Sequence, residues 1–238
     1  SAENYAAEIG ADYIKQTQPK LFIKPDPFTS NRSEGASRLG YLPIYEKENA
    51  FDLLGDYDKI AIIDSDVYIR SGSPNFFDQL EGQHFAGYCE REGPITSEYA
   101  RKITNYSQMQ YSQIDPRIDF RWNLWGAELF NMGVMLLDKS FKDHLGGMDA
   151  KTWIQQPKFK PFVDGQGNWK WSTDQTLLNV FVKLKQMKVK HLSYKWNALF
   201  TAVPIESIYN AHFIHFFLKD KLPDRGENIE ELARVCKI

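Results

Sequence analysis

Two apolar runs that meet polar residues at one end dominate the pattern of this chain. The first extends from Ile60 to Ile63 and is followed at once by Asp64-Ser65-Asp66. The second extends over residues 131–138 and is entered through an Asn-x-Gly corner at Asn131. An unbroken apolar run of this kind is typical of a strand that is covered on both faces. We therefore predict two central strands of a sheet that is flanked by helices.

Weaker patterns place the remaining elements around these two strands. Short apolar segments predict strands at 13–14, 21–23, 85–89, 189–192 and 211–217, with 67–69 as a continuation of the first central strand. Helical spacing predicts a helix from about residue 6 and others over 33–45, 97–106, 141–153 and 173–184, with a loop at 157–168. Strands and helices alternate, which predicts an α/β fold. The sequence has no internal repeat and no Gly/Ser linker, so we expect a single domain over residues 1–238.

Composition narrows the classes of function. The 238 residues are 42% hydrophobic and 25% charged, which are globular averages that exclude a disordered, collagen-like or coiled-coil chain. The net charge of −2 provides no basic field, so we expect no nucleic-acid partner. No apolar run approaches the length of a membrane span, and we expect neither a transmembrane segment nor a signal peptide. Two cysteines are too few for a disulfide framework, which favours a reducing compartment such as the cytoplasm.

Asp64 and Asp66 are the first candidates for chemistry, because they lie where a buried strand meets a loop. Open α/β sheets place their ligands at such points. In an extended segment, side chains two residues apart point the same way, so both carboxylates can face one site. They repel each other unless a cation or a proton is shared between them. Hard oxygen ligands favour Mg²⁺ or Mn²⁺, so the pattern predicts a divalent metal site, with a pair of turn or cap aspartates as the alternative.

His215 is a candidate third ligand, embedded in the apolar segment 213–217. Neutral imidazole is a common metal ligand, although a lone histidine in such a segment is more often a satisfied core residue. His212 competes for the role, and in a strand its side chain points roughly to the opposite face. Lys219 and Lys221 follow directly, and a cation there would stabilise negative charge on a leaving group. Their alternative role is in a solvated loop.

Asp174 and Gln175 open the helix predicted over 173–184. Ser172 or Thr173 is suited to cap this helix, and an acidic residue in its first turn is favourable to the helix dipole. That structural explanation is sufficient by itself. The functional hypothesis is that Asp174 and Gln175 project from the start of the helix towards a substrate.

The order of these motifs resembles that of GT-A-fold glycosyltransferases, in particular glycosyltransferase family 8, which includes glycogenin-like and bacterial retaining galactosyl- and glucosyltransferases. The resemblance covers roughly residues 35 to 221. Tyr57 to Asp66 resembles the strand and Asp-x-Asp signature of the family, and Arg38 with Tyr41-Leu42-Pro43 resembles the R-x-x-x-L-P helix before it. Phe130 to Leu137 resembles the F-N-x-G-V strand, and Asp174 to Asn179 resembles the D-Q-x-x-L-N helix start. Trp196-Asn197 resembles the W-N pair, and Ile214-His215-Phe216 with Lys219 resembles the metal-ligand histidine and the diphosphate lysine.

The resemblance implies a fold and an activity. The fold would be a Rossmann-like GT-A domain with a mixed, mostly parallel sheet flanked by helices, its donor half over about 1–90 and its acceptor half over about 91–238. The activity would be transfer of a hexose from a nucleotide-diphosphate sugar, a UDP-sugar first among them, to a glycan or other hydroxyl acceptor, with retention of configuration. The cofactor would be Mn²⁺ or Mg²⁺.

The resemblance also implies residue roles. Asp66 and His215 would bind the metal, and Asp64 would be shared between the metal and the nucleotide ribose. The residues implied for the rest of the donor site are Arg38 and Ser65 near the nucleotide, Lys219 and Lys221 at the diphosphate, and Asn131, Asp174 and Gln175 around the donor sugar and acceptor.

The aromatic content of 14% suggests where the acceptor docks. Sugar rings have apolar faces that can pack on indoles. Five tryptophans and one asparagine flank the expected site, and we expect them to form an acceptor platform. They are Trp122, Trp125, Trp169, Trp171, Trp196 and Asn197. The alternative is that these rings fill the core.

Two other functions stay open at this stage. A haloacid-dehalogenase-like phosphatase also places Asp-x-Asp after a buried strand, with Asp64 as nucleophile and Asp66 as acid/base, but no later acidic pair follows here. A catalytically silent sugar- or nucleotide-binding GT-A domain is the second alternative. It is favoured because family members begin with a buried strand that contacts the nucleotide base, whereas this chain begins in a helix. The sequence leaves the donor base and the oligomeric state open.

Overall fold

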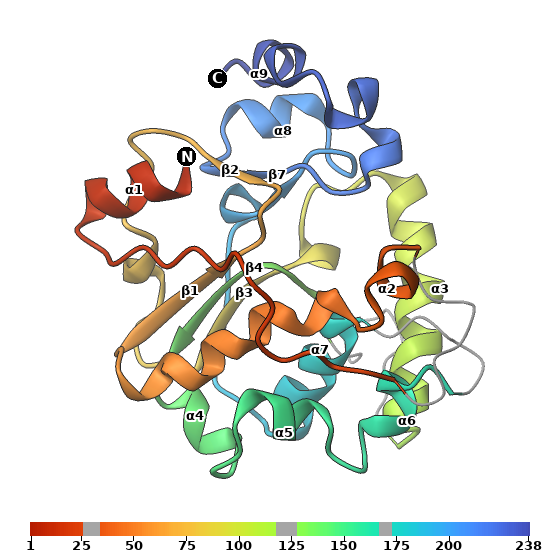
Figure 1. Ribbon diagram of the computed structural model, residues 1–238. Coiled ribbons are helices and arrows are strands. Elements are labelled where there is room, and N and C mark those ends of the chain that lie inside the picture. Colours follow the sequence, from red (N-terminus) through yellow and green to blue (C-terminus); the bar gives the residue numbers. More distant parts are fainter. Residues whose placement is uncertain (26–33, 118–127, 167–172) are drawn as a thin grey trace.

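The computed structural model describes residues 1–25, 34–117, 128–166 and 173–238 (Figure 1). The strands are β1 (Lys59–Ile63), β2 (Val67–Ile69), β3 (Phe85–Cys89), β4 (Phe130–Asp138), β5 (Val189–His191), β6 (Ala198–Leu199) and β7 (Phe213–His215). The α-helices are α1 (Ala2–Ile9), α2 (Glu34–Leu39), α3 (Ser97–Ile114), α4 (Phe141–His144), α5 (Ala150–Ile154), α6 (Lys160–Val163), α7 (Asp174–Leu184), α8 (Ile205–Tyr209) and α9 (Ile229–Cys236). The 3-10 helices are η1 (Pro43–Gly55), η2 (Phe76–Gln79), η3 (Glu90–Glu92), η4 (Tyr194–Trp196), η5 (Lys219–Lys221) and η6 (Pro223–Gly226).

The described strands form two sheets. The larger sheet has the order β1-β4-β3-β5, and the smaller has the order β2-β7-β6. Strand β4 runs antiparallel to both β1 and β3, whereas β3 and β5 are parallel. The α/β fold with a mixed sheet flanked by helices is therefore confirmed. Most pairings of the larger sheet are antiparallel rather than parallel, because β4 lies between two strands that both run opposite to it.

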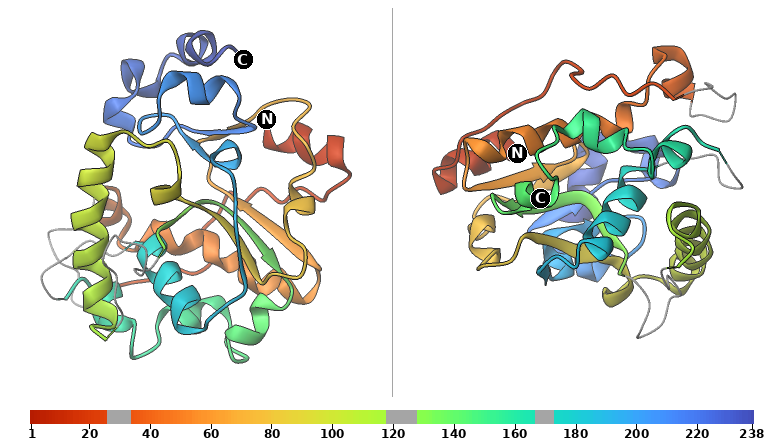
Figure 2. Two further views of the ribbon diagram at one scale, coloured as in Figure 1. Left: turned by 180° about the vertical axis from the view of Figure 1, so that it is seen from behind. Right: turned by 90° about the horizontal axis from the view of Figure 1, so that it is seen from below.

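The larger sheet is covered on both faces, as Figure 2 shows. On β1, Ile62 packs into a core cluster with Phe51, Trp153 and other residues of the neighbouring helices. The alternate residues Ala61 and Ile63 pack against a second cluster, which contains side chains of α3 and β7. The apolar run at 60–63 is unbroken because each of its faces meets a separate core, as the sequence predicted.

The N-terminal third of the chain differs from the prediction. Residues 11–25 contain no helix or strand, so the strands predicted at 13–14 and 21–23 are wrong. The carboxylate of Glu46 accepts hydrogen bonds from the backbone amides of Lys20, Leu21 and Phe22 at 2.6, 2.9 and 2.7 Å. The Glu46 side chain thus accepts the hydrogen bonds that these backbone amides would donate to a neighbouring strand if the segment were itself a strand.

Glycine and proline divide two of the predicted helices. The helix predicted over 33–45 ends with α2, because Gly40 has a left-handed φ of 73° and Pro43 begins η1. The helix predicted over 141–153 is split into α4 and α5, with Gly146 and Gly147 also left-handed between them. The loop predicted at 157–168 contains the short helix α6.

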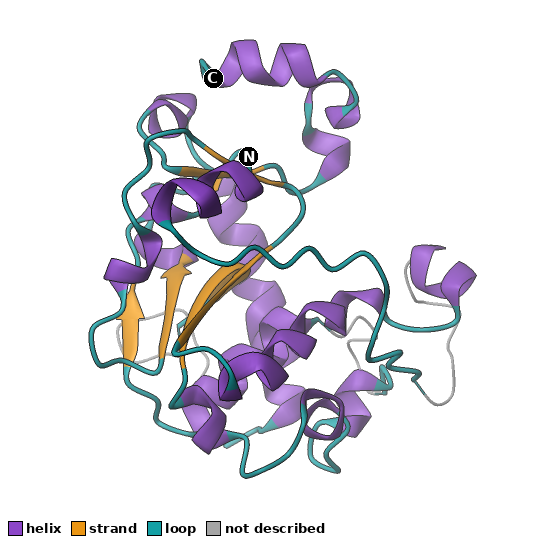
Figure 3. Cartoon of the chain, turned by 60° about the vertical axis from the view of Figure 1, so that its left-hand side comes forward, coloured by secondary structure: helices purple, strands orange, loops and turns teal. Residues whose placement is uncertain are grey.

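The segment at 67–69 is strand β2, which belongs to the smaller sheet rather than continuing β1. Residues 64–66 therefore form the link between the two sheets. Figure 3 shows the smaller sheet and both ends of the chain on the same side of the larger sheet. No helix in the described part of the chain combines the length and apolar character needed to cross a membrane.

Candidate active site

Asp64, Asp66 and His215 converge where the two sheets meet. The aspartates lie between β1 and β2, and His215 ends β7. Pairing of Val67 with His215 across the smaller sheet brings the imidazole beside Asp66, with Nε2 3.3 Å from Oδ1. One potential ligand atom from each of the three residues lies within 4.8 Å of the other two. The pair Asp64 and Asp66 and the remote His215, all candidates from the sequence, therefore form one cluster.

Gly133 makes the space that the imidazole occupies. It lies on β4, and its carbonyl accepts a hydrogen bond from the amide of Asp64 at 2.8 Å. A β-carbon at this position would lie 2.2 Å from Cε1 of His215, far inside the contact distance. The imidazole is only 6% exposed and has little room to withdraw. The glycine of the Asn-x-Gly corner is thus required by the packing of His215.

Gly133→Ala should lower the free energy of unfolding by about 1–3 kcal/mol, because it overpacks a buried site. Gly55→Ala is the matched control, since its β-carbon would meet only the flexible end of Lys142, the Nζ atom at 2.8 Å. Urea denaturation of both variants measures the difference. Equal stability of the two variants would contradict the packing role of Gly133.

A chain of amides orients the imidazole. His215 Nδ1 lies 3.1 Å from Oδ1 of Asn197, whose Nδ2 donates to Oδ1 of Asn131 at 2.9 Å. Asn131 in turn donates from Nδ2 to Oε1 of Glu90 at 2.8 Å. A carboxylate only accepts, so it fixes the orientation of each amide and places the imidazole proton on Nδ1. Nε2, which faces Asp66, is then the nitrogen available to a metal ion, an arrangement that is usual for metal-binding histidines.

Glu90 anchors this network, although its role was not predicted from the sequence. It is 1% exposed and also accepts hydrogen bonds from the hydroxyl of Tyr99 at 2.8 Å and from Nε2 of Gln175 at 3.1 Å. Burial raises the pKa of Glu90, and the three donors oppose that shift. The available signal was its position directly after the apolar strand at 85–89, which repeats the arrangement of Asp64 after β1.

Lys47 is the second missed residue. Its Nζ lies 2.9 Å from Oδ1 of Asp64 and 2.8 Å from Oδ2 of Asp174, and it donates to the carbonyl of Met132 at 2.8 Å. Burial alone would lower the pKa of Lys47, but the carboxylates of Asp174 and Asp64 outweigh it and raise that pKa. The Lys47 side chain is therefore a permanent cation between a metal-candidate aspartate and the start of α7.

Glu48 adds a buried carboxyl group beside this ion cluster. It is 0% exposed, and neither of its carboxyl oxygens has a hydrogen-bond partner in another residue within the described ranges. Burial and the nearby charge of Asp174 raise its pKa well above the ordinary value, which favours the neutral acid. Burial likewise raises the pKa of Asp174, against the attraction of Lys47.

The charges of the cluster suit a divalent cation. Burial disfavours ionisation of Asp66, but the hydrogen bond and charge of His215 outweigh it and lower the pKa of Asp66. That hydrogen bond needs a proton between Nε2 and the carboxylate, and a bound metal ion would replace this proton. The cation of Lys47 stands against the three carboxylates of Asp64, Asp66 and Asp174. With the imidazole neutral, as a metal ligand must be, two negative charges are in excess and Nε2 faces them. Two carboxylates and one imidazole are ligands that Mn²⁺ accepts.

The other donor-site candidates lie at the surface. Ser65 and Arg38 are exposed, the first between β1 and β2 and the second near the end of α2. Lys219 pairs with Glu227 at 3.6 Å, and Lys221 pairs with Glu98 at 3.4 Å. Ser65, Arg38, Lys219 and Lys221 thus lie outside the connected group of candidate residues. That group consists of Asp64, Asp66, His215, Asn131, Asp174, Gln175 and Asn197.

The residues expected to form the acceptor platform are only partly described. Trp122, Trp125, Trp169 and Trp171 lie outside the described residues. Trp196 is 4% exposed, and its indole packs against the rings of Phe76, Phe213 and His212. Its neighbour Asn197 is fully buried and orients His215.

Several solved glycosyltransferases are similar in structure to this chain. An active-site variant of LgtC superposes with a TM-score of 0.50 at 15% identity, over 89% of this chain and 71% of that one. The galactosyltransferase LgtC in complex with donor and acceptor sugar analogs gives 0.48 at 15% identity, over 81% of this chain and 66% of that one. Mouse xyloside xylosyltransferase 1 gives 0.45 at 14% identity, over 85% and 70%.

The fold is that of GT-A glycosyltransferases. No protein-family model matches the sequence, and the search of curated proteins finds no match either. The chain spans 66% of the length of the LgtC chain in the sugar-analog complex, slightly less than two thirds. The likeness therefore establishes the architecture, and the activity has to be argued from the residues of the site.

Proposed function

We propose that this chain is a metal-dependent glycosyltransferase, which moves a hexose from a nucleotide-diphosphate sugar to a hydroxyl acceptor. One observation is central to the proposal: Asp64, Asp66 and His215 have potential ligand atoms within 4.8 Å of one another on a GT-A fold. Lys47 and Asp174 lie directly beside this cluster.

Asp64, Asp66 and His215 would hold Mn²⁺ or Mg²⁺. Three features support the fit: the excess negative charge, the Nε2 atom of His215 directed towards Asp66, and the space that Gly133 leaves for the ring. The bound cation would supply positive charge against the negative charge that develops on a departing nucleoside diphosphate. Asn197 and Asn131 act as positioning residues, because they orient His215 through hydrogen bonds.

Four residues are proposed to bind the nucleotide part of the donor, a UDP-sugar in the simplest case. Arg38 and Ser65 would contact the nucleoside, and Lys219 and Lys221 the diphosphate. The present ion pairs of the two lysines join side chains that are 46–79% exposed. Exposed pairs of this kind contribute little to stability, so the lysines can exchange their carboxylate partners for phosphate oxygens at small cost.

The sugar is proposed to lie against Asp174, Gln175 and Asn131. Gln175 is an amide and cannot act as a base, and Asp174 is already paired with Lys47 at 2.8 Å. We infer a front-face transfer in which the acceptor oxygen bonds to the anomeric carbon as the bond from that carbon to the phosphate oxygen breaks. The acceptor proton passes to that phosphate oxygen, so charge is balanced within the reacting atoms. NMR of the product should show retention, and inversion would rule this mechanism out.

A panel of nucleotide sugars tests the function directly. We expect Mn²⁺-dependent release of a nucleoside diphosphate from one donor, slowly to water and faster when a hydroxyl acceptor is added. Phosphate release from phosphomonoesters would instead indicate a phosphatase. Donor binding without turnover across the panel would indicate a catalytically silent domain, and either result would overturn the proposal.

A further inference from the structure

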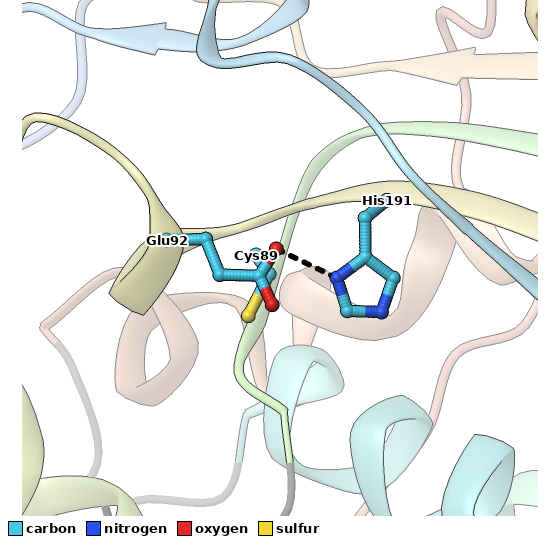
Figure 4. A group of neighbouring side chains, drawn as sticks. All are labelled: Cys89, Glu92 and His191. Atoms are coloured by element: carbon cyan, nitrogen blue, oxygen red, sulfur yellow. Dashed lines mark hydrogen bonds and ion pairs between the residues drawn. The ribbon is translucent and has the colours of Figure 1, made fainter. Parts of the chain in front are cut away.

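A second cluster of potential metal ligands lies outside the candidate active site. It consists of Cys89 at the end of β3, Glu92 in η3 and His191 at the end of β5 (Figure 4). One ligand atom from each residue lies within 4.8 Å of the other two. None of the three is a ligand candidate of the Asp64, Asp66 and His215 cluster.

The backbone brings these three residues together. Strands β3 and β5 are parallel with Gly87 opposite His191, so their carboxyl ends meet at the same edge of the sheet. After Cys89 the chain turns tightly through η3, where the amide of Gly93 donates to the carbonyl of Glu90 at 3.3 Å. A β-carbon at Gly93 would lie 1.6 Å from the Tyr88 hydroxyl, so the turn accepts only glycine there.

The three side chains already interact in pairs. His191 Nδ1 lies 2.7 Å from Oε2 of Glu92, a contact that requires a shared proton. The Cys89 sulfur is buried beneath them, and burial raises the pKa of its thiol to about 11. A cation at this point would replace both the shared proton and the thiol proton.

The donor set selects the kind of metal. Sulfur and imidazole nitrogen with one carboxylate suit Zn²⁺, whereas Mg²⁺ and Mn²⁺ favour oxygen ligands. Tetrahedral zinc with bonds of about 2.0–2.3 Å needs ligand atoms roughly 3.3–3.8 Å apart. The side chain of Glu92 is 48% exposed and can close the remaining distance by a rotamer change. The exposed side of Glu92 and His191 leaves a fourth position for water.

We propose that Cys89, Glu92 and His191 bind one Zn²⁺ ion, separately from the metal of the proposed transferase site. The ion would also hold η3, and this turn contains Glu90, the anchor of the hydrogen-bond network at His215. Zinc at this site therefore stabilises the turn that supports the candidate active site without entering it. The proposal does not depend on the activity of the chain.

Titration of the whole chain with Zn²⁺ and with Co²⁺ tests this site. In the Asp66→Ala background, which disables the other candidate metal site, we expect one Zn²⁺ ion per chain, and a thiolate-to-cobalt charge-transfer band in the near ultraviolet on addition of Co²⁺. Cys89→Ser and His191→Ala should remove the band and weaken Zn²⁺ binding at least about a hundredfold, because each removes a ligand rather than an outer-shell partner. Cys236→Ser, which replaces the other buried cysteine, and Asp66→Ala should keep the band.

Two results in the Asp66→Ala background would overturn the site: Co²⁺ bound without a thiolate band, or an additional Cys89→Ser substitution that leaves the Zn²⁺ affinity unchanged. Should Cys89→Ser fail to fold, Glu92→Gln provides the test, because it changes a partly exposed side chain and keeps its size. Zn²⁺ binding by Glu92→Gln at the affinity of the unmodified chain would then count against the proposal. Retention of the band in Asp66→Ala distinguishes this site from the transferase metal whether or not sugar transfer is detected.

Discussion

Asp66→Ala should reduce the metal-stimulated release of nucleoside diphosphate by at least about 10²–10³-fold. The substitution removes the carboxylate that lies 3.3 Å from Nε2 of His215, and with it one of the three candidate metal ligands. Metal charge on a leaving phosphate contributes several kcal/mol to transition-state stabilisation, and each 1.4 kcal/mol is about a tenfold change in rate. The measurement is the rate of diphosphate release at a series of Mn²⁺ concentrations.

Asp220→Ala is the matched control. Asp220 is also an exposed aspartate, with 83% of its side chain accessible and its carboxylate paired with Arg225 at 2.9 Å. This variant should release diphosphate at the rate of the unmodified chain. Unchanged turnover in Asp66→Ala, or an equal loss in both variants, would refute the metal role of Asp66. Circular dichroism of both variants excludes unfolding as the cause.

The sequence predicted those features of the site that have a local signature. The run at 60–63 identified a strand with two covered faces, and the aspartates that follow it do lie at the site. His215 was recognisable as a polar residue within an apolar strand. The Asn-x-Gly corner predicted the entry to β4, but the packing reason for Gly133 appears only when β7 is placed beside it.

Residues that depend on contacts between distant segments could not be predicted in this way. Lys47 lies between Glu46 and Glu48, which suggests a solvated charged turn. Only the packing of η1 against β1 carries its amine to Asp64 and Asp174. Strand direction is equally non-local, because a buried strand has the same apolar pattern whether its neighbours are parallel or antiparallel. The pattern of apolar residues therefore could not predict the strand order β1-β4-β3-β5.

Lys47→Met should lower the free energy of unfolding by about 3–5 kcal/mol at pH 7. The Lys47 side chain is 19% exposed and that of its partner Asp174 is 6% exposed, so the substitution leaves a carboxylate with little access to water and without its cation. Removal of one partner from a buried ion pair costs this much because the remaining charge is uncompensated. Methionine keeps the length of the side chain, which limits the contribution from lost packing. Denaturant unfolding measures the change without any substrate.

The pH dependence of this loss identifies its source. Without Lys47, the pKa of Asp174 should rise further above its unfolded value, because burial already raises it and the opposing cation is gone. A carboxyl group whose pKa is higher in the folded state stabilises that state fully at a pH below its pKa in the unfolded chain. This stabilisation is lost as the pH rises through its pKa in the folded chain. The loss in free energy of unfolding caused by Lys47→Met should therefore be smallest at acid pH and grow towards neutral pH.

Asp174→Asn in the Lys47→Met background separates charge from packing. The double variant cannot ionise at residue 174, so it should recover part of the lost stability and show a flatter pH dependence than Lys47→Met alone. A double-mutant cycle then gives the coupling between the two side chains, which is expected to reach about 1–3 kcal/mol for groups in direct contact. A deficit that does not change with pH, or a coupling near zero, would mean that Lys47 stabilises the fold by packing. Lys47 would then not be the cation that holds Asp64 and Asp174 together.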